Sequence, residues 1–505
     1  MRTTPAGLRV GAALLLVGLA GCGSTVQLAG SGLSRDGVAG LTSAIGAPSA
    51  GGSGADQGAV PSGSANTLPQ GGLAAPIQTT SEGTLSPSAS GGTLSKDLPS
   101  SGLGYTATTL EVGVTTNKDA QATLATVGIA SGSLGDQEAM TKAVMGDINA
   151  QGGVLGRKLV PVFHDVKTTE TSTNPPAAAQ TACAAFTQDT HVAAALELVL
   201  DSRDFAACMI KRRTFVVSSG LTFTDKTYVK GLSPYFFRLA SPLEENLVPT
   251  YLARLTALGY FSPWDTVSGR PGNSRVGVGL FHVDEPAPTR AFHDIATRLQ
   301  ALGYKVTSYA YGRQDASYQS AVLRFQSAGV THVIGDNASY AQLMVQAQSQ
   351  HYYPRYGMTS YNGGGVLLQQ VAPAAELAGA LGVGWAPSVD VDGAHDPGST
   401  GPAYNRCLAS MHRHQVDVST RAALANALGI CDGLQVLVQS MRAGRGFDGP
   451  HITAGRATFS FEATATFSGS HNDGSIAIPT AVRDYGYLAN CSCFAYLSKS
   501  NHPLQ

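Results

Sequence analysis

The run from Ile148 to Leu159, INAQGGVLGRKL, constrains the fold more than any other part of this chain, because it joins a helix to a strand through glycine turns. Upstream of it, apolar residues recur at helical spacing, which predicts an amphipathic helix over Asp136–Ala150. Gly152 and Gly153 supply the positive φ with which a helix readily ends. The apolar residues that follow predict a buried strand over Leu159–Phe163.

Strand and helix patterns alternate along the chain in two successive runs. The strands expected in the first run are Leu110–Thr115, Leu159–Phe163, Val192–Leu196 and Phe215–Ser218. The helices expected between them are Asp136–Ala150, Pro176–Gln188 and Asp204–Lys211. The second run has expected strands at Val276–Phe281, Val306–Tyr311, His332–Gly335 and Ala380–Trp385, and expected helices at Thr289–Leu302, Tyr318–Ala328 and Tyr340–Gln350. Later helices are expected around Tyr404–His414 and Leu424–Arg442, before a β-rich tail from Ala457. This alternation predicts an α/β protein with two doubly wound parallel-sheet lobes.

The spacing Asn149-x-x-Gly152-Gly153-x-x-Gly156 before a second strand resembles the first lobe of periplasmic solute-binding proteins of the leucine/isoleucine/valine-binding type. The resemblance implies a type I clamshell, two lobes joined by a hinge that the chain crosses three times. It implies a first lobe of residues 109–240 plus about 386–450, and a second lobe of residues 241–385 plus part of 451–505. It further implies a monomeric receptor that delivers a small-molecule ligand to the permease and ATPase subunits of an ABC importer, without catalytic residues or a cofactor.

The N-terminus has the features of a bacterial lipoprotein signal. Arg2 and Arg9 flank the start of an apolar stretch, Val10–Leu19, which is too short to span a bilayer as a stable helix. The stretch ends in Leu-Ala-Gly-Cys22, which resembles a lipobox. We therefore expect residues 1–21 to be removed and Cys22 to be lipidated, which anchors the protein to the extracytoplasmic face of the bacterial cell membrane.

Residues 22–108 are dominated by Gly, Ser, Ala, Pro and Thr, with few charges. Such a segment buries too little apolar surface to offset its ordering entropy, so we expect a flexible tether. A glycosylated stalk is an open alternative. The formal net charge of the chain is −1, and no long basic run occurs, which argues against a nucleic-acid partner.

The cysteines that follow Cys22 are even in number, as expected for disulfides in an oxidising compartment. Neighbouring helices on one face of a sheet pack side by side, so cysteines on consecutive expected helices could pair. The pairs expected on this basis are Cys183–Cys208 and Cys407–Cys431. Cys491 and Cys493 could pair only in a strained local loop, or remain reduced. A zinc site at this last pair is not expected, since no second ligand pair with suitable spacing follows.

We expect the ligand in the loops after the strands, because open α/β sheets bind ligands outside the carboxyl ends of their strands. The resembled family binds the ligand carboxylate with hydroxyl and backbone N–H groups of the first lobe. The residues that match this role are Ser202, Ser218, Gly220 and Thr222.

The second lobe departs from the resembled family, whose amino-acid binders hold the ligand ammonium with a tyrosine and an acidic residue. The tyrosine position falls at Asp336 or Asn337. The acidic position falls near Ser360 and Tyr361, where no carboxylate stands. Asp336 could supply the missing anion from the neighbouring loop. We therefore expect a small polar ligand such as an amino acid or an amide, and a ligand without an amine remains open.

Enzyme and metal sites have weak support in the sequence. The densest ionisable cluster, His282, Asp284, Glu285 and His293, matches no compact zinc motif and is typical of a polar loop before a helix N-terminus. No Gly-x-Ser-x-Gly, Walker or dinucleotide motif occurs in a strand–turn–helix context. A ligand sensor that does not transport, and an enzyme on an α/β scaffold, remain as alternative functions.

Overall fold

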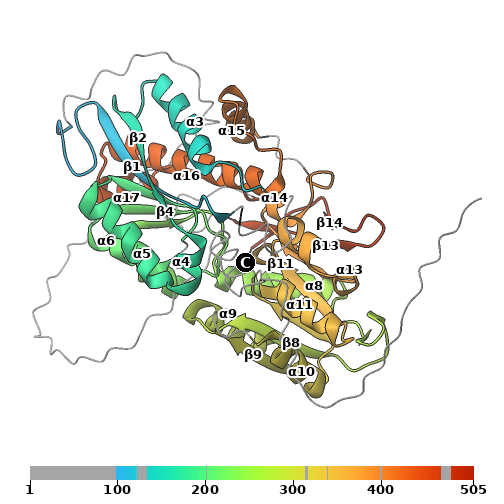
Figure 1. The fold of residues 1–505 in the computed structure, drawn as a ribbon. Coiled ribbons are helices and arrows are strands. Elements are labelled where there is room, and N and C mark those ends of the chain that lie inside the picture. The colour runs from blue at the N-terminus through green and yellow to red at the C-terminus, as the bar shows by residue number, and fades with distance from the viewer. Residues whose placement is uncertain are drawn as a thin grey trace, which may run out of the picture.

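The structure is a computed structural model, and it describes residues 98–120, 122, 133–200, 202–312, 317–337, 339–397, 401–467 and 479–504. Within them the chain forms two α/β lobes that lie side by side (Figure 1). The expected signal peptide, Cys22 and the tether up to residue 97 lie outside the described residues.

The first lobe is built on a parallel sheet with the strand order β2-β1-β3-β4-β5. Its strands are β1 (Thr109–Thr116), β2 (Lys158–Asp165), β3 (Ala194–Glu197), β4 (Phe215–Ser218) and β5 (Phe236–Arg238). Every residue of β3, β4 and β5 is buried. Full burial is expected for a parallel sheet that helices cover on both faces.

Helices cover both faces of this sheet (Figure 1). One group is α4 (Thr168–Thr173), α5 (Pro175–Ala184) and α6 (Arg203–Lys211), with a π-helical turn, η1 (Ala185–Asp189), after α5 and a short helix, α7 (Lys226–Lys230), after β4. The other group is α3 (Gln137–Ala150), α15 (Pro402–Arg413), α16 (Arg421–Gly444) and α17 (Gly449–Arg456). Residues 402–456 thus return to the first lobe after the chain has built most of the second, and α16 contacts β3 and β4.

The motif that joins α3 to β2 has a direct structural explanation. Asp136 caps α3 by accepting a hydrogen bond from Ala139 N. After the helix, Gly153 has a φ of +72°, and a Cβ there would lie 2.0 Å from the Arg157 carbonyl oxygen, so no larger residue fits. The Asn149 side chain ties the helix to the strand, since its Nδ2 donates to Leu159 O at 2.9 Å and its Oδ1 accepts from Leu159 N at 2.7 Å.

The second lobe has a larger sheet with the order β14-β13-β12-β11-β10-β8-β9. Its parallel strands are β8 (Gly277–Val283), β9 (Lys305–Tyr311), β10 (His332–Gly335), β11 (Arg355–Thr359) and β12 (Leu381–Gly384). The chain end adds antiparallel strands, β13 (Ala481–Leu488), β14 (Cys493–Tyr496) and β15 (His502–Pro503). A small hairpin, β6 (Trp264–Asp265) with β7 (Arg270–Pro271), lies outside this sheet.

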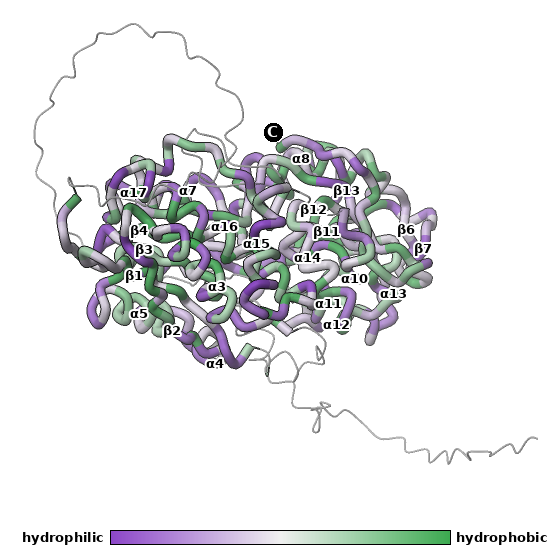
Figure 2. The backbone as a smooth tube through the Cα atoms, turned by 90° about the horizontal axis from the view of Figure 1, so that it is seen from above, coloured by the Kyte–Doolittle hydropathy of each residue, from purple (hydrophilic) through white to green (hydrophobic). Residues whose placement is uncertain are grey.

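Two apolar clusters cover the faces of the second sheet. One contains side chains of α8 (Glu244–Ala257) and α9 (Pro286–Ala301). The other contains side chains of α10 (Tyr318–Ala328), α11 (Ser339–Ser349) and α13 (Ala374–Leu377). Shorter elements follow β11 and β12, namely η2 (Ser360–Asn362), η3 (Gly364–Leu368), α12 (Gln369–Val371) and α14 (Pro387–Asp390). In Figure 2, hydrophobic residues concentrate on the inner strands such as β1 and β4.

These two doubly wound sheets confirm the fold class expected from the sequence. The helix α16 is the one described helix long and apolar enough to cross a membrane, but most of its apolar window is buried inside the protein, as in the core helix of a globular protein. The β-rich tail begins later than Ala457, because residues 457–467, the described part of the last crossing between the lobes, form no strand, and the next strand is β13.

Residues 98–108, which composition assigned to the expected tether, belong to the described part of the chain. Residues 98–108 pack against the first lobe, where Arg157 donates to Thr106 O at 2.6 Å and to Pro99 O at 2.7 Å. The Tyr105 ring contacts Phe447, with 5.0 Å between the ring centroids. The folded region therefore includes the last part of the segment that composition alone assigned to the tether.

All six cysteines that the structure describes are paired. Two disulfides join neighbouring helices, Cys183–Cys208 between α5 and α6 and Cys407–Cys431 between α15 and α16, which confirms both expected pairs. Cys491 and Cys493 form a third, local disulfide between β13 and β14, rather than remaining reduced.

Candidate functional site

A cavity opens between the two lobes, and its empty space, counted together with the part that is open to solvent, is about 1030 Å³. We call it the interlobe cavity. Its first-lobe wall consists of Leu134, Leu198, Ser219, Gly220, Leu221, Leu239 and Ala240, and its helical wall of Ala422, Ala425, Asn426, Gly429 and Asp432 on α16. Its second-lobe wall consists of Val366, Leu367, Ala386, Ser388 and Val389, with Ala465 and Thr466 from the last crossing.

The lining of the interlobe cavity is mostly aliphatic. Among its described lining residues, Asp432 is the only one with an ionisable side chain, so none of them offers a cation. Leucine, valine and alanine side chains come from both lobes and from α16. Such a surface favours a ligand with an apolar body, because apolar area is then removed from water on both sides.

Asp432 holds the last crossing against α16 rather than pointing a free charge at the cavity. Its carboxylate accepts hydrogen bonds from Thr464 Oγ1 at 2.7 Å, from Thr464 N at 2.9 Å and from Ala465 N at 3.0 Å. Burial raises the pKa of Asp432 to about 7, although these hydrogen bonds act in the opposite direction. Asp432 therefore positions Ala465 and Thr466 in the cavity wall.

Thr466 is a polar residue of the cavity lining. Its Oγ1 is buried and has no hydrogen-bond partner among the described residues. A buried hydroxyl without a partner costs about 1–3 kcal/mol. A hydrogen-bonding group of a bound ligand would remove that cost, so this hydroxyl is a candidate ligand contact.

Among the binding residues expected from the sequence, Gly220 is in the cavity lining. A buried polar network holds the loop that carries it. Ser218, at the end of β4, donates to the carboxylate of Glu197 and accepts from Arg238 Nη1 at 2.9 Å. The Gly220 carbonyl oxygen accepts from Ser241 Oγ at 3.1 Å. Ser218 therefore acts within the first lobe, where it positions the loop that carries Gly220.

The two other expected first-lobe residues are also engaged within their own lobe. Ser202 caps α6, where its Oγ accepts from Phe205 N at 3.3 Å. Thr222 is buried, and its backbone N donates to Ser241 Oγ at 2.9 Å. Neither residue is in the cavity lining, and their contact with a ligand stays a prediction.

The expected second-lobe residues Asp336 and Asn337 face Tyr311. Asp336 is fully buried, and it accepts from Val283 N at 2.6 Å and from the Tyr311 hydroxyl at 2.9 Å. Asn337 accepts from Ser339 N at 2.8 Å and from the same hydroxyl at 3.2 Å. These contacts hold three loops of the second lobe together at the carboxyl end of its sheet.

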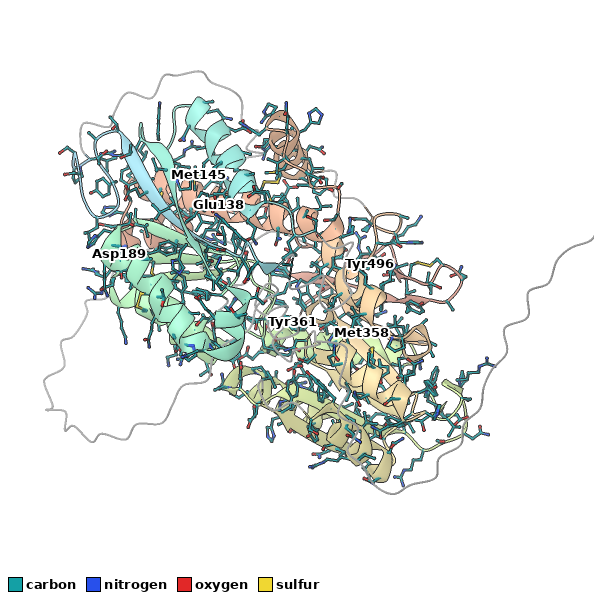
Figure 3. All side chains as sticks on the ribbon, viewed as in Figure 1. Glu138, Met145, Asp189, Met358, Tyr361 and Tyr496 are labelled. Atoms are coloured by element: carbon teal, nitrogen blue, oxygen red, sulfur yellow. A yellow bond between two sulfur atoms is a disulfide. The ribbon has the colours of Figure 1, made fainter. Side chains whose placement is uncertain are left out.

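Ser360 and Tyr361 lie beside buried carboxyl groups that come from elsewhere in the chain. Ser360 Oγ is 3.0 Å from Asp390 Oδ2, and burial raises the pKa of Asp390 to about 7. The Tyr361 hydroxyl donates to Glu244 Oε1 at 2.7 Å, and burial raises the pKa of Glu244 to about 8. Tyr361 lies at the junction of the lobes (Figure 3), where its ring contacts Phe223.

The binding residues expected from the sequence therefore do not include most of the cavity wall. The walls on α14 and α16 come from segments that lie far from the loops after β3 and β4 in sequence. One signal was available, because Asp432 is the acidic residue among the mostly apolar buried positions of α16. Helix α16 also contacts α14 and η3, which carry the second-lobe wall of the cavity.

Comparisons with known proteins agree with this arrangement. A family model described as periplasmic binding protein matches residues 124–474. No curated protein sequence matches the chain significantly. Among solved structures, a solute binding protein of an ABC transporter from Rhodopseudomonas palustris BisB5, in complex with 3,4-dihydroxybenzoic acid, is similar with a TM-score of 0.56 and 13% identity, covering 78% of this chain and 98% of that one.

Two further structures share the fold. The fatty acid ABC transporter substrate-binding protein of Thermomonospora curvata has a TM-score of 0.53 and 13% identity, covering 80% of this chain and 95% of that one. The branched-chain amino acid transporter substrate binding protein of Streptococcus pneumoniae, in complex with isoleucine, has a TM-score of 0.51 and 14% identity, covering 78% of this chain and 99% of that one. The resemblance inferred from the glycine motif is thus confirmed, and the chain belongs to the periplasmic binding protein family.

Proposed function

We propose that this protein is a lipid-anchored extracytoplasmic receptor that encloses a small amphipathic ligand in the interlobe cavity and delivers it to an ABC importer. The observation that carries the proposal is the cavity itself, which has walls from both lobes and from α16. A ligand that touches both walls stabilises the closed clamshell, because it binds that state better than the open one.

The lining narrows the class of ligand. Leu198, Leu221, Val366 and Val389 would contact an apolar body, and Thr466 Oγ1 would meet a hydrogen-bonding head group. No described lining residue is cationic, so a carboxylate on the ligand would depend on hydroxyl and backbone donors. Within the class of small polar ligands expected from the sequence, a molecule with an apolar body, such as an apolar amino acid, an aliphatic amide or an aromatic acid, fits this lining best.

The ligands of the structural relatives fall in the same range. The relatives above were solved with 3,4-dihydroxybenzoic acid and isoleucine, or are named for fatty acids. Each of these molecules combines an apolar body with a polar head group. The parallel supports the ligand class, and the low identity leaves the particular molecule to experiment.

A thermal-shift screen tests the ligand class. We expect isoleucine, isobutyramide, 4-hydroxybenzoate or octanoate to raise the melting temperature, because a ligand that binds only the folded state stabilises it by mass action. Glutamate and glucose serve as polar controls of similar size. Stabilisation by the polar controls alone would contradict the proposal.

The anchor is tested separately at Cys22. We expect the unchanged protein to fractionate with membranes and to incorporate labelled fatty acid, because acyl chains on an N-terminal cysteine partition into the bilayer. Cys22→Ala should abolish both. Membrane association that persists in Cys22→Ala without any label would contradict lipid anchoring while leaving ligand binding untouched.

A further inference from the structure

A cluster of sulfur and imidazole groups lies outside the interlobe cavity, where β13 turns into β14. We call it the Cys–His cluster, and it consists of the Cys491–Cys493 disulfide, His395 and Asp392. His395 follows α14 in the chain, 98 residues from Cys493, yet its ring nitrogens Nδ1 and Nε2 lie 3.5 and 3.7 Å from Cys493 Sγ. The fold thus places an imidazole against one sulfur of this disulfide.

The two sulfurs of this disulfide differ in exposure. Cys491 is exposed, whereas Cys493 is 2% exposed and faces His395. In the other two disulfides at least one partner is fully or nearly fully buried and neither is exposed. Among the described cysteines, Cys491 is therefore the one that an incoming thiolate reaches most easily, and access is a main determinant of exchange rate.

Asp392 orients the imidazole. Its Oδ1 lies 2.7 Å from His395 Nδ1 and 3.0 Å from the His395 backbone N. Burial acts to raise the pKa of Asp392, but the hydrogen bonds from His395 outweigh it, so the pKa is lowered and the group is a carboxylate at neutral pH. With Nδ1 donating to Asp392, Nε2 is the nitrogen left to interact with Cys493.

Ser492, between the two cysteines, has a φ of +53°. A residue with a side chain adopts this left-handed backbone at a cost, and such residues often mark functional positions. Opening the disulfide would free Ser492 to leave this conformation. The exposure of Cys491, the imidazole contact of Cys493 and the backbone conformation of Ser492 all favour opening of this disulfide by an incoming thiolate.

We propose that Cys491–Cys493 is a thiol–disulfide exchange centre that oxidises a dithiol. A thiolate of the dithiol attacks Cys491 Sγ, a bond forms between these two sulfurs, and the bond between Cys491 and Cys493 breaks. The electron pair of that bond stays on Cys493, whose thiolate receives the Nε2 proton of the imidazolium form of His395, leaving a neutral ring with its proton on Nδ1 toward Asp392. The second thiolate of the dithiol then attacks the first dithiol sulfur, and the bond between that sulfur and Cys491 breaks. The released Cys491 thiolate and the neutral His395 each take up a proton from solvent, which received the two protons of the dithiol. In sum, a dithiol becomes a disulfide and the protein gains two thiols.

A metal site is the competing use of the same residues. No second ligand pair with zinc-site spacing follows Cys493 in the sequence, but the fold brings His395 to within 4.8 Å of both sulfurs. In the structure both sulfurs are bonded to each other, so neither is a thiolate that could bind a metal. The proposed exchange reaction therefore starts from the exposed disulfide.

Selective reduction tests the proposal on the purified full chain. The protein is treated with increasing dithiothreitol, quenched with an alkylating agent and mapped by peptide mass spectrometry. We expect Cys491 and Cys493 to be alkylated at least about tenfold faster than the four cysteines of the other disulfides, because the attacked sulfur is accessible. Equal rates for all three disulfides would overturn the proposal, and so would zinc retained by a reduced Cys491 and Cys493 in the protein as purified.

His395→Ala tests the role of the imidazole. We expect the reduction of Cys491–Cys493 to slow by roughly tenfold, because the leaving thiolate loses its proton donor. Imidazole added to the solution should restore part of the rate, which a purely structural role of His395 would not allow. The matched control is His451→Ala, which removes another histidine that contacts an aspartate three residues earlier, Asp448, and that lies outside the Cys–His cluster.

The Cys407–Cys431 disulfide provides an internal control for folding, since its reduction rate rises if a variant unfolds. An unchanged rate at Cys491–Cys493 in folded His395→Ala would overturn the assigned role of His395. An equal slowing in His451→Ala would do the same.

Discussion

Gly429 is a position where one added side chain would fill the interlobe cavity without disturbing the fold. It lines the cavity from α16, and a Cβ there would have Ser219 Cβ as its nearest neighbour at 3.5 Å, an ordinary contact. Gly433, one turn later on the same helix, is different. A Cβ there would lie 2.3 Å from Leu196 Cδ1 inside the first-lobe core. The two glycines therefore separate filling of the cavity from disturbance of the core.

We expect Gly429→Leu to weaken the binding of an apolar ligand by about 3 kcal/mol, taking about 0.8 kcal/mol for each carbon of the added side chain that displaces ligand. That loss corresponds to roughly a hundredfold in affinity. The fold should not suffer, because replacing a helical glycine by leucine stabilises a helix by about 0.8 kcal/mol. Gly433→Ala should show the opposite behaviour, with a loss of about 1–3 kcal/mol of stability from overpacking and unchanged affinity of the folded fraction.

Isothermal titration calorimetry with the ligand found in the thermal-shift screen measures the affinities, and denaturant unfolding measures the stabilities. Full affinity in a folded Gly429→Leu variant would refute the reasoning, because the ligand would then bind elsewhere. A loss of affinity in Gly433→Ala as large as that in Gly429→Leu would also refute it.

Three further predictions concern polar groups and cross-links. Thr466→Val should stabilise the unliganded protein and weaken ligand binding by about 1 kcal/mol in calorimetry. The control is Ser440→Ala, which removes another buried hydroxyl without a partner among the described residues and should leave binding unchanged. Burial raises the pKa of Glu244 from 4.5 to about 8, so between these pH values the folded protein holds a proton that the unfolded chain releases. The free energy of unfolding should therefore be highest at low pH and fall as pH rises from about 4.5 to 8. Glu244→Gln should flatten that fall in unfolding experiments at several pH values. Removing the Cys407–Cys431 disulfide, whose partners are 24 residues apart, should lower the free energy of unfolding by about 3 kcal/mol in denaturant unfolding. Removing Cys491–Cys493, whose partners are 2 residues apart, should lower it less, because the closed loop is shorter. Equal losses would contradict the loop-entropy reasoning.

Local patterns were sufficient to predict much of the fold. The strands Phe215–Ser218 and His332–Gly335 and the helix Tyr318–Ala328 have the bounds that periodicity and glycine stops indicated. Strand burial on both faces and helix caps are encoded in short windows of sequence, so they can be read without tertiary information. The helix α17 and the late start of the antiparallel tail were missed, because packing rather than local pattern determines them.

The candidate site was less predictable, because it depends on contacts between distant segments. Gly220 was found from its position after β4, but Thr466 and the α16 wall reach the cavity only through the last crossing. Asp390 and Glu244 lie beside Ser360 and Tyr361, where the sequence indicated that no carboxylate stood. Long-range pairs of this kind, like His395 with Cys493, leave no periodic signal in the chain.

A crystal structure with the ligand from the thermal-shift screen tests the central proposal most directly. We predict a ligand between the Ser219–Leu221 loop and α14, with its apolar body against α16 and a polar atom within hydrogen-bond distance of Thr466 Oγ1. A ligand bound outside the interlobe cavity, or one held in it by a charged head group away from Thr466, would contradict the proposal.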